Sequence, residues 1–326
     1  MDEPAYEPAG PRGLSRVQDW VADRLERIPP EAWPFIVLAV FAVAANGPAV
    51  LSGGSLDLLL LASLTVGALL PAAIVIGCRD AWRSARLVLV GAVVWTSIPV
   101  AVDVISSGQR LLSPETWTDT SIVSGLETAR ELAGMLSLAG PALLALGLMQ
   151  RRRTETTWPR ALVALALIGT AALCVYAARS AIDQYENFQG FSGTGLGGAF
   201  AFSDPLFVVG VALDPVRILT VGALAWSTLS AVRASEEPHR FWWLVFAGSA
   251  VLFGLTILSI TLGLAEASGA LAPDTYMAVF GPISWVEVLG GLAGMALLLV
   301  GFGLGLPAAD PLAGGEEAVV SVVRLS

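Results

Sequence analysis

Apolar residues occur in long runs along this chain, separated by short stretches that contain prolines, glycines and charged residues. A helix that crosses a bilayer needs about 20 apolar residues, because it rises about 1.5 Å per residue across a hydrocarbon core of about 30 Å. Eight runs come close to this length and predict eight transmembrane helices in an all-α polytopic membrane protein. The runs cover residues 34–51, 58–78, 87–105, 126–149, 161–179, 215–232, 241–265 and 284–306.

The segments that flank these runs have a different pattern. Between Leu14 and Ile28, apolar residues recur at helical spacing with acidic residues and arginine on the other faces. This pattern predicts an amphipathic helix that lies in the membrane interface, within a cytoplasmic segment of residues 1–32. Residues 307–326 are predicted to form a short acidic cytoplasmic tail.

The chain also repeats itself. LTVGAL occurs at 64–69 and 219–224, and LAGM occurs at 132–135 and 292–295. SPETW at 113–117 resembles APDTY at 272–276, and a Trp-Pro pair precedes the first and the fifth run. These matches predict a tandem duplication, because self-similarity in a fixed order is typical of repeated structural units.

Each predicted repeat contains four spans, residues 33–153 in the first and residues 154–306 in the second. An even number of spans gives both repeats the same orientation, so we expect a pseudo-twofold axis along the membrane normal and a cavity between the halves. The second repeat contains an additional outer insertion at 184–213, rich in glycine and phenylalanine. Its short apolar run at 205–213 predicts either a re-entrant or surface-lying segment or a flexible loop.

Composition supports the membrane assignment and narrows the chemistry. Hydrophobic residues make up 55% of the 326 positions and charged residues only 14%, against about 25% charged residues in soluble domains. All 18 basic residues are arginine, as in GC-rich bacterial genomes. One histidine and two cysteines cannot supply the usual zinc or haem ligands. We therefore expect no metal and no cofactor, and we find no nucleotide-binding motif and no basic domain for nucleic acid.

The arginines predict the orientation of the chain. With eight alternating spans, 14 arginines fall on the side of the two termini and only Arg110, Arg130, Arg179 and Arg217 on the other. Because positive residues collect in cytoplasmic loops, we expect both termini in the cytoplasm of a bacterium, with the spans in its inner membrane. The outer side then carries 13 acidic residues and a net charge of −9.

Several charged residues lie close to or within the apolar runs. Ser124 to Glu127 and Ser284 to Glu287 both match the capping box that begins a helix, and Asp214-Pro215 matches an N-cap followed by a first-turn proline. This interpretation makes them helix caps, and it pairs Arg217 with Asp214 or Glu287. The alternative is a functional site, because a charge inside the membrane is costly.

The functional interpretation predicts an acidic outer vestibule for an ion or polar substrate. Nine charged residues from several spans would converge at one outer level: Asp103, Glu127, Arg130, Glu131, Arg179, Asp183, Asp214, Arg217 and Glu287. Arginines in such a ring could bind phosphate or carboxylate groups. An acidic outer rim without a ligand is the alternative.

Three functions fit this sequence. The first is a transporter-like or permease-like protein with a cavity between its halves, in contact with the lipid bilayer and without catalytic residues. The second is a non-catalytic subunit or scaffold that packs against other membrane subunits. The third is an enzyme that processes lipids or their headgroups with outer carboxylates. The sequence favours the first and gives little support for catalysis.

Overall fold

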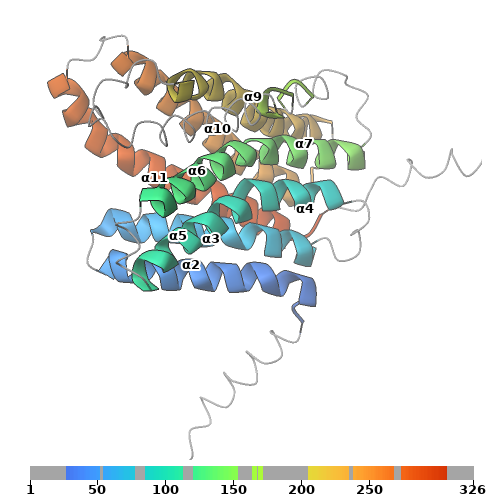
Figure 1. Ribbon diagram of the computed structural model, residues 1–326. Helices are drawn as coiled ribbons and strands as arrows, with labels where there is room; N and C mark the ends of the chain where they lie inside the picture. Colours follow the sequence, from blue (N-terminus) through green and yellow to red (C-terminus); the bar gives the residue numbers. More distant parts are fainter. Residues whose placement is uncertain are drawn as a thin grey trace, which may run out of the picture.

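The computed structural model describes residues 27–51, 54–77, 85–112, 120–152, 164–166, 168–171, 205–234, 238–267 and 273–306. Every regular element within these ranges is a helix (Figure 1). The elements are η1 (Pro30–Ala32), α2 (Trp33–Leu51), α3 (Ser55–Gly77), α4 (Arg86–Ala92), η3 (Val93–Ser97), α5 (Ile98–Leu112), α6 (Thr120–Ser137), α7 (Ala139–Arg152), α9 (Pro205–Arg233), α10 (Arg240–Ala267) and α11 (Pro273–Gly303).

The membrane character predicted from the apolar runs is confirmed. Within the described ranges, seven helical stretches are long and apolar enough to cross a bilayer, and they coincide with seven of the eight predicted spans. The fifth predicted span, residues 161–179, is described only in two short helical pieces. The predicted amphipathic helix up to residue 26, the insertion from 184 to 204 and the tail from 307 lie outside the described residues.

The third span contains a widened turn. Between α4 and α5, η3 is a π-helical turn that places Trp95 and Ser97 on the inner side of the bundle. The hydroxyl of Thr96 donates a hydrogen bond to the carbonyl of Ala92 at 2.8 Å. Such π turns shift the register of a helix by one residue and often occur at functional sites.

The fourth span is interrupted at Leu138. The backbone N–H of Leu138 donates to the carbonyl of Met135 at 3.1 Å, which tightens the last turn of α6 before α7 begins. Pro141 lies in the first turn of α7, where its missing N–H costs no hydrogen bond within the helix.

The helix-cap interpretation of the charged residues is wrong. Helix α11 begins at Pro273 and continues through Pro282, so Glu287 lies near its middle. Helix α9 likewise continues through Pro215, and Glu127 lies in the second turn of α6, which begins at Thr120. A proline removes one backbone donor, and transmembrane helices tolerate this loss when neighbouring groups satisfy the freed carbonyl.

The short apolar run at 205–213 is also reassigned. It forms the first turns of α9 and continues directly into the sixth predicted span, so it is neither a re-entrant segment nor a loop. The helix does not begin at Asp214-Pro215, as the sequence pattern predicts, but continues across this pair.

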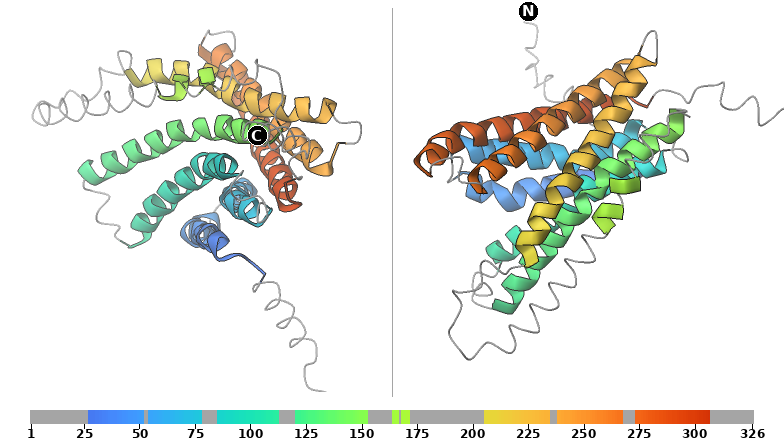
Figure 2. Two further views of the ribbon diagram at one scale, coloured as in Figure 1. Left: turned by 90° about the vertical axis from the view of Figure 1, so that its right-hand side faces the viewer. Right: turned by 90° about the horizontal axis from the view of Figure 1, so that it is seen from above.

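The helices pack into one bundle in which the two chain halves interlock (Figures 1 and 2). Helix α11, the last in the chain, packs against both α10 and α3, and α7 packs against both α4 and α9. The largest core cluster accordingly contains residues from both halves, such as Leu70, Leu144, Leu224 and Leu298. Phe302 packs edge-on against Phe241 at 5.3 Å between ring centroids.

Two helix pairs are packed through glycine at backbone distance. A Cβ on Gly91 of α4 would lie 2.8 Å from the carbonyl oxygen of Gly140 in α7. In the other half, a Cβ on Gly248 of α10 would lie 2.7 Å from the carbonyl oxygen of Gly294 in α11. Small residues permit such close approach of membrane helices.

Each of the two helix pairs has a second glycine contact, which lies about one turn away along α4 and α10 and about two turns away along α7 and α11. A Cβ on Gly147 would meet Val88, and a Cβ on Gly301 would meet Val245. The preceding leucines, Leu87 and Leu244, complete the two contacts at 3.2 and 3.3 Å. The pairs α4·α7 and α10·α11 therefore pack through corresponding residues.

Candidate functional site

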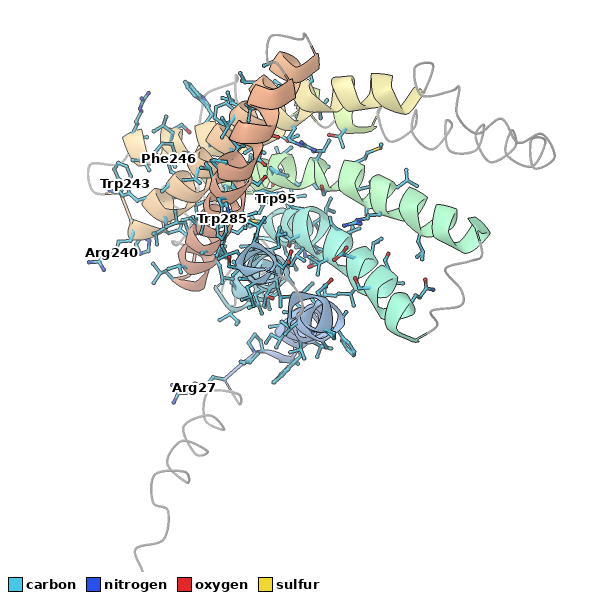
Figure 3. The ribbon with its side chains drawn as sticks, turned by 90° about the vertical axis from the view of Figure 1, so that its left-hand side faces the viewer. Arg27, Trp95, Arg240, Trp243, Phe246 and Trp285 are labelled. Atoms are coloured by element: carbon cyan, nitrogen blue, oxygen red, sulfur yellow. The ribbon has the colours of Figure 1, made fainter. Side chains whose placement is uncertain are left out.

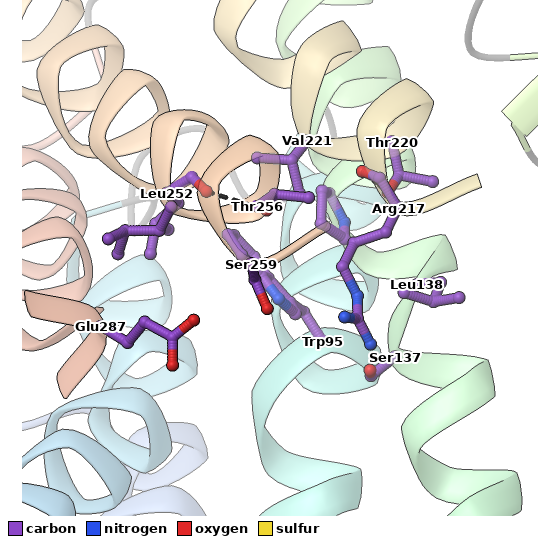
Figure 4. Close-up of a pocket in the computed structure, with 12 residues that line it drawn as sticks. Trp95, Ser137, Leu138, Arg217, Thr220, Val221, Leu252, Thr256, Ser259 and Glu287 are labelled. Carbon is purple, nitrogen blue, oxygen red and sulfur yellow. Dashed lines mark hydrogen bonds between the residues drawn. The ribbon is translucent and has the colours of Figure 1, made fainter. Parts of the chain in front are cut away.

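A pocket of about 300 Å³ lies between the two halves of the bundle (Figure 4). Helix α7, the end of α6 and the π turn form one wall, and α9, α10 and α11 form the other. Its lining residues are Trp95, Ser137, Leu138, Pro141, Arg217, Thr220, Val221, Leu252, Leu255, Thr256, Ser259 and Glu287.

Two of the predicted site residues, Arg217 and Glu287, line this pocket together. Figure 4 shows the two side chains reaching toward the same space from different helices, with Ser259 and Trp95 between them. Within the part of the chain that the structure describes, neither side chain forms an ion pair or a side-chain hydrogen bond. The pocket therefore contains an uncompensated cation and an uncompensated anion that do not contact each other.

Both charges lie well inside their helices. Arg217 precedes Arg233, the end of α9, by 16 residues, and Glu287 precedes Gly303, the end of α11, by 16 residues. At about 1.5 Å per residue, each lies about 24 Å along the helix from that end. Each charge therefore lies inside its helix, and a charge without a partner inside a membrane span costs free energy.

Hydroxyl groups surround the two charges. Thr220 and Thr256 donate to the backbone carbonyls of Arg217 and Leu252, at 3.0 and 2.9 Å. Ser137 donates to the carbonyl of Gly134. The hydroxyl oxygens of these residues retain free lone pairs, and Ser259 has no hydrogen bond among the described residues. The pocket thus offers both acceptors and a free donor beside the charges.

Trp95 forms part of the opposite wall because of the π turn. It contributes the aromatic surface of the pocket, and a Cβ added to Gly140 would collide with it. The tight contact with α7 is made by the Cα and Cβ of Trp95, and it fixes the position from which the indole extends. An aromatic face fixed beside a charged pocket can bind a cation through the ring quadrupole.

A second group of predicted site residues forms a separate ion pair. Arg130 Nη2 of α6 lies 3.2 Å from Asp103 Oδ1 of α5. The Arg130 side chain is 64% exposed and that of Asp103 is 19% exposed. Neither residue lines the pocket, so this ion pair is separate from Arg217 and Glu287.

The other predicted vestibule residues are not tested by these contacts. Glu127 and Glu131 lie in α6 and Asp214 lies in α9, but their side chains are outside the described part of the structure. Arg179 and Asp183 lie outside the described residues altogether.

The sequence gave no direct signal for the neutral residues of the pocket. Ser137, Thr256 and Ser259 lie in apolar runs where a hydroxyl most often bonds to the backbone of its own helix. Trp95 resembles any other aromatic residue of a span. Only the juxtaposition of five spans identifies these residues.

Among the described residues, no group of three or more His, Cys, Asp or Glu side chains could hold a metal ion. Comparison with known protein families, with curated proteins and with solved structures finds no match to this chain.

Proposed function

We propose that this chain is a transporter-like or permease-like protein of a bacterial inner membrane, and that the pocket between its halves is part of the substrate path. The observation that carries this proposal is the pair Arg217 and Glu287, which line one pocket at the contact between the halves and have no ion-pair partner among the described residues. Unpaired charges inside membrane spans are rare and typically mark substrate or ion pathways.

The proposal includes the internal duplication, which the glycine contacts support. Val88 and Val245 correspond at an offset of 157 residues, and Gly147 and Gly301 correspond at an offset of 154. The LTVGAL segments of α3 and α9 differ by 155. Three helix pairs thus share nearly one offset, as a tandem copy requires.

These contacts also favour a different register for one of the sequence matches. LAGPALLALG at 138–147 matches LAGMALLLVG at 292–301, and both segments pack through their glycines in the same way. We infer that this segment, and not LAGM at 132–135, is the counterpart of residues 292–301. In this register Glu127 and Glu287 are not equivalent.

Helix packing supports the same symmetry. The contact of α3 with α11 corresponds to the contact of α9 with α7. The contact of α3 with the π turn corresponds to the contact that Gly222 of α9 makes with Phe253 of α10. A twofold relation between the halves would produce such reciprocal contacts.

The proposed orientation, with both termini in the cytoplasm, is supported by residues at one end of the bundle. Figure 3 shows Arg27 and Arg240 at its periphery, close to the starts of the first span and of α10. Trp243 is half-exposed one turn into α10 and packs edge-on against Phe246. Arginine and amphipathic aromatic residues collect at the membrane interface, and arginine does so on the cytoplasmic side.

Thiol labelling tests this function without knowledge of the substrate. Cys78 and Cys174 are first replaced by alanine, and Ser259→Cys is introduced in the pocket. Alternating access exposes the pocket to water from each side of the membrane in turn. A membrane-impermeant maleimide should therefore modify this cysteine both in right-side-out vesicles and in inverted vesicles.

Ile257→Cys is the matched control. It lies on the same helix two positions earlier, and Ile257 is exposed on the bundle surface and does not line the pocket. A lipid-facing cysteine should resist the reagent from both sides. Labelling of Ser259→Cys from one face alone, or from neither, would contradict transport and would favour a non-catalytic subunit.

A further inference from the structure

We propose that the pocket binds a zwitterionic ligand, with an anionic phosphate or carboxylate group at Arg217 and an ammonium group at Glu287. This inference rests on the proposed function and names the class of its substrate. The ligand is either a free solute or the headgroup of a lipid, since both can carry the same pair of charges.

The first argument is the separation of the two charges. Arg217 and Glu287 line the same pocket but lie farther apart than an ion pair, which requires 4.0 Å or less between nitrogen and oxygen. If their role were structural, the two would be expected to pair, because a charge inside a membrane span is costly without a partner. A ligand with one charge of each sign neutralises both at once, whereas a simple anion or cation leaves one uncompensated.

The second argument comes from the corresponding positions of the other half. At the offsets established by the glycine and LTVGAL segments, Arg217 corresponds to Ala62, Glu287 to Ala133 and Ser137 to Gly291. Thr220, Val221 and Leu138, by contrast, correspond to identical residues, Thr65, Val66 and Leu292. Each charge, and the hydroxyl of Ser137, is therefore present in one half and absent from the corresponding position of the other half. This difference is unexpected if the fold itself required these groups.

The third argument is the match between the pocket and such a ligand. A volume of about 300 Å³ accommodates on the order of ten water-sized groups. Arginine donates paired hydrogen bonds to phosphate or carboxylate oxygens, and the hydroxyls of Ser137 and Ser259 can extend this set. Trp95 and Glu287 together provide an aromatic face and a carboxylate, which both attract an ammonium group.

Protection from thiol labelling tests the inference. O-Phosphoethanolamine is added to Ser259→Cys protein in phosphatidylglycerol vesicles, and the labelling rate is compared with rates in inorganic phosphate and in ethanolamine. We expect phosphoethanolamine to slow labelling at least fivefold and the single-charge compounds to have little effect. Arg217→Gln and Glu287→Gln should each abolish the protection.

Vesicles that contain phosphatidylethanolamine distinguish the two sources of the ligand. Protection by this lipid, without protection by the soluble compound, would identify a lipid headgroup as the ligand, and the reverse would identify a free solute. Equal protection by phosphate or ethanolamine alone would overturn the inference, and so would the absence of protection in every arm. If Ser259→Cys were still labelled from both faces of the membrane in either of these two outcomes, the proposed transport function would stand although the zwitterionic ligand would not.

Discussion

One wall of the pocket is formed by α9 and α11, and the corresponding surface in the other half is formed by α3 and α6. The two surfaces differ in their polar residues, whereas the helix packing in the two halves is similar. Arg217 and Glu287 on one side correspond to Ala62 and Ala133 on the other. By contrast, Gly248, Gly294 and Gly301 of the α10–α11 contact align, under the proposed duplication, with Gly91, Gly140 and Gly147 of the α4–α7 contact.

This difference separates two kinds of constraint. Residues that maintain contact between helices are the same in both halves, because both halves meet the same packing requirement. Residues that differ are free of this requirement, so their chemistry reflects what one half does alone. On this basis we propose that the glycines belong to the scaffold and that the charged pair serves the proposed function.

The largest effect is expected from leucine at the shared glycines. Gly91→Leu and Gly248→Leu place a branched side chain where a Cβ already lies within 2.8 and 2.7 Å of a facing carbonyl. Even modest overpacking costs about 1–3 kcal/mol. We expect both variants to lose monodisperse folded protein in size-exclusion chromatography.

Gly134→Leu and Gly254→Leu are the controls for this experiment, because a Cβ on either glycine meets no atom within 4 Å. Both should yield normal amounts of folded protein. If Gly91→Leu disrupted the protein and Gly248→Leu did not, the two helix pairs would not share one packing requirement, and the comparison would fail.

A smaller destabilisation is expected when the charge is introduced into the other half. Ala62→Arg adds a cation inside α3 without a counterion, and such a charge costs up to about 3 kcal/mol in a membrane. The midpoint of thermal unfolding in detergent should fall. Ala62→Leu is the matched control and should leave the midpoint almost unchanged. An unchanged midpoint for Ala62→Arg would indicate that both positions accept charge, and that the asymmetry is accidental.

Removal of a pocket charge is expected to stabilise the folded protein. Glu287→Gln keeps the side-chain shape but removes an unpaired carboxylate, and residues kept for function are often retained at a cost in stability. The unfolding midpoint should rise while ligand protection is lost. A lower midpoint would show that the carboxylate contributes to folding, in contradiction to its assignment.

The smallest effect is expected at the Asp103–Arg130 pair. Its arginine is 64% exposed, and such surface pairs contribute about 1 kcal/mol or less. A double-mutant cycle with Asp103→Asn and Arg130→Gln should give a coupling energy within this range, with thiol labelling of the pocket unaffected. A coupling energy several times larger would show that Asp103 and Arg130 do not behave as a surface pair, and it would contradict their separation from the pocket charges.

The sequence predicted the membrane helices well because each depends on a local property, the length of its apolar run. It failed where helices were judged to begin. The sequence pattern predicts helix starts at Asp214-Pro215 and at Ser284, but a proline ends a helix only if the freed carbonyl finds no other partner, and this depends on neighbouring helices.

The candidate site was predicted only in part for a similar reason. Arg217 and Glu287 were recognisable as charges in apolar segments, yet their shared pocket depends on the packing of α7, α9, α10 and α11. Ser259 and Trp95 carry no local signal that separates them from ordinary residues of a span. Their role follows from helix neighbours that are distant in the sequence.

The contact between α3 and α11 has a consequence for how the protein is made. The ribosome completes α3 long before α11, and at their ends the N–H of Leu306 donates to the carbonyl of Gly77 at 3.3 Å. During synthesis, α3 therefore waits in the bilayer with one face covered only by lipid. This face is covered only when α11 arrives, so a chain truncated before α11 would present it to the proteases that remove incomplete membrane proteins.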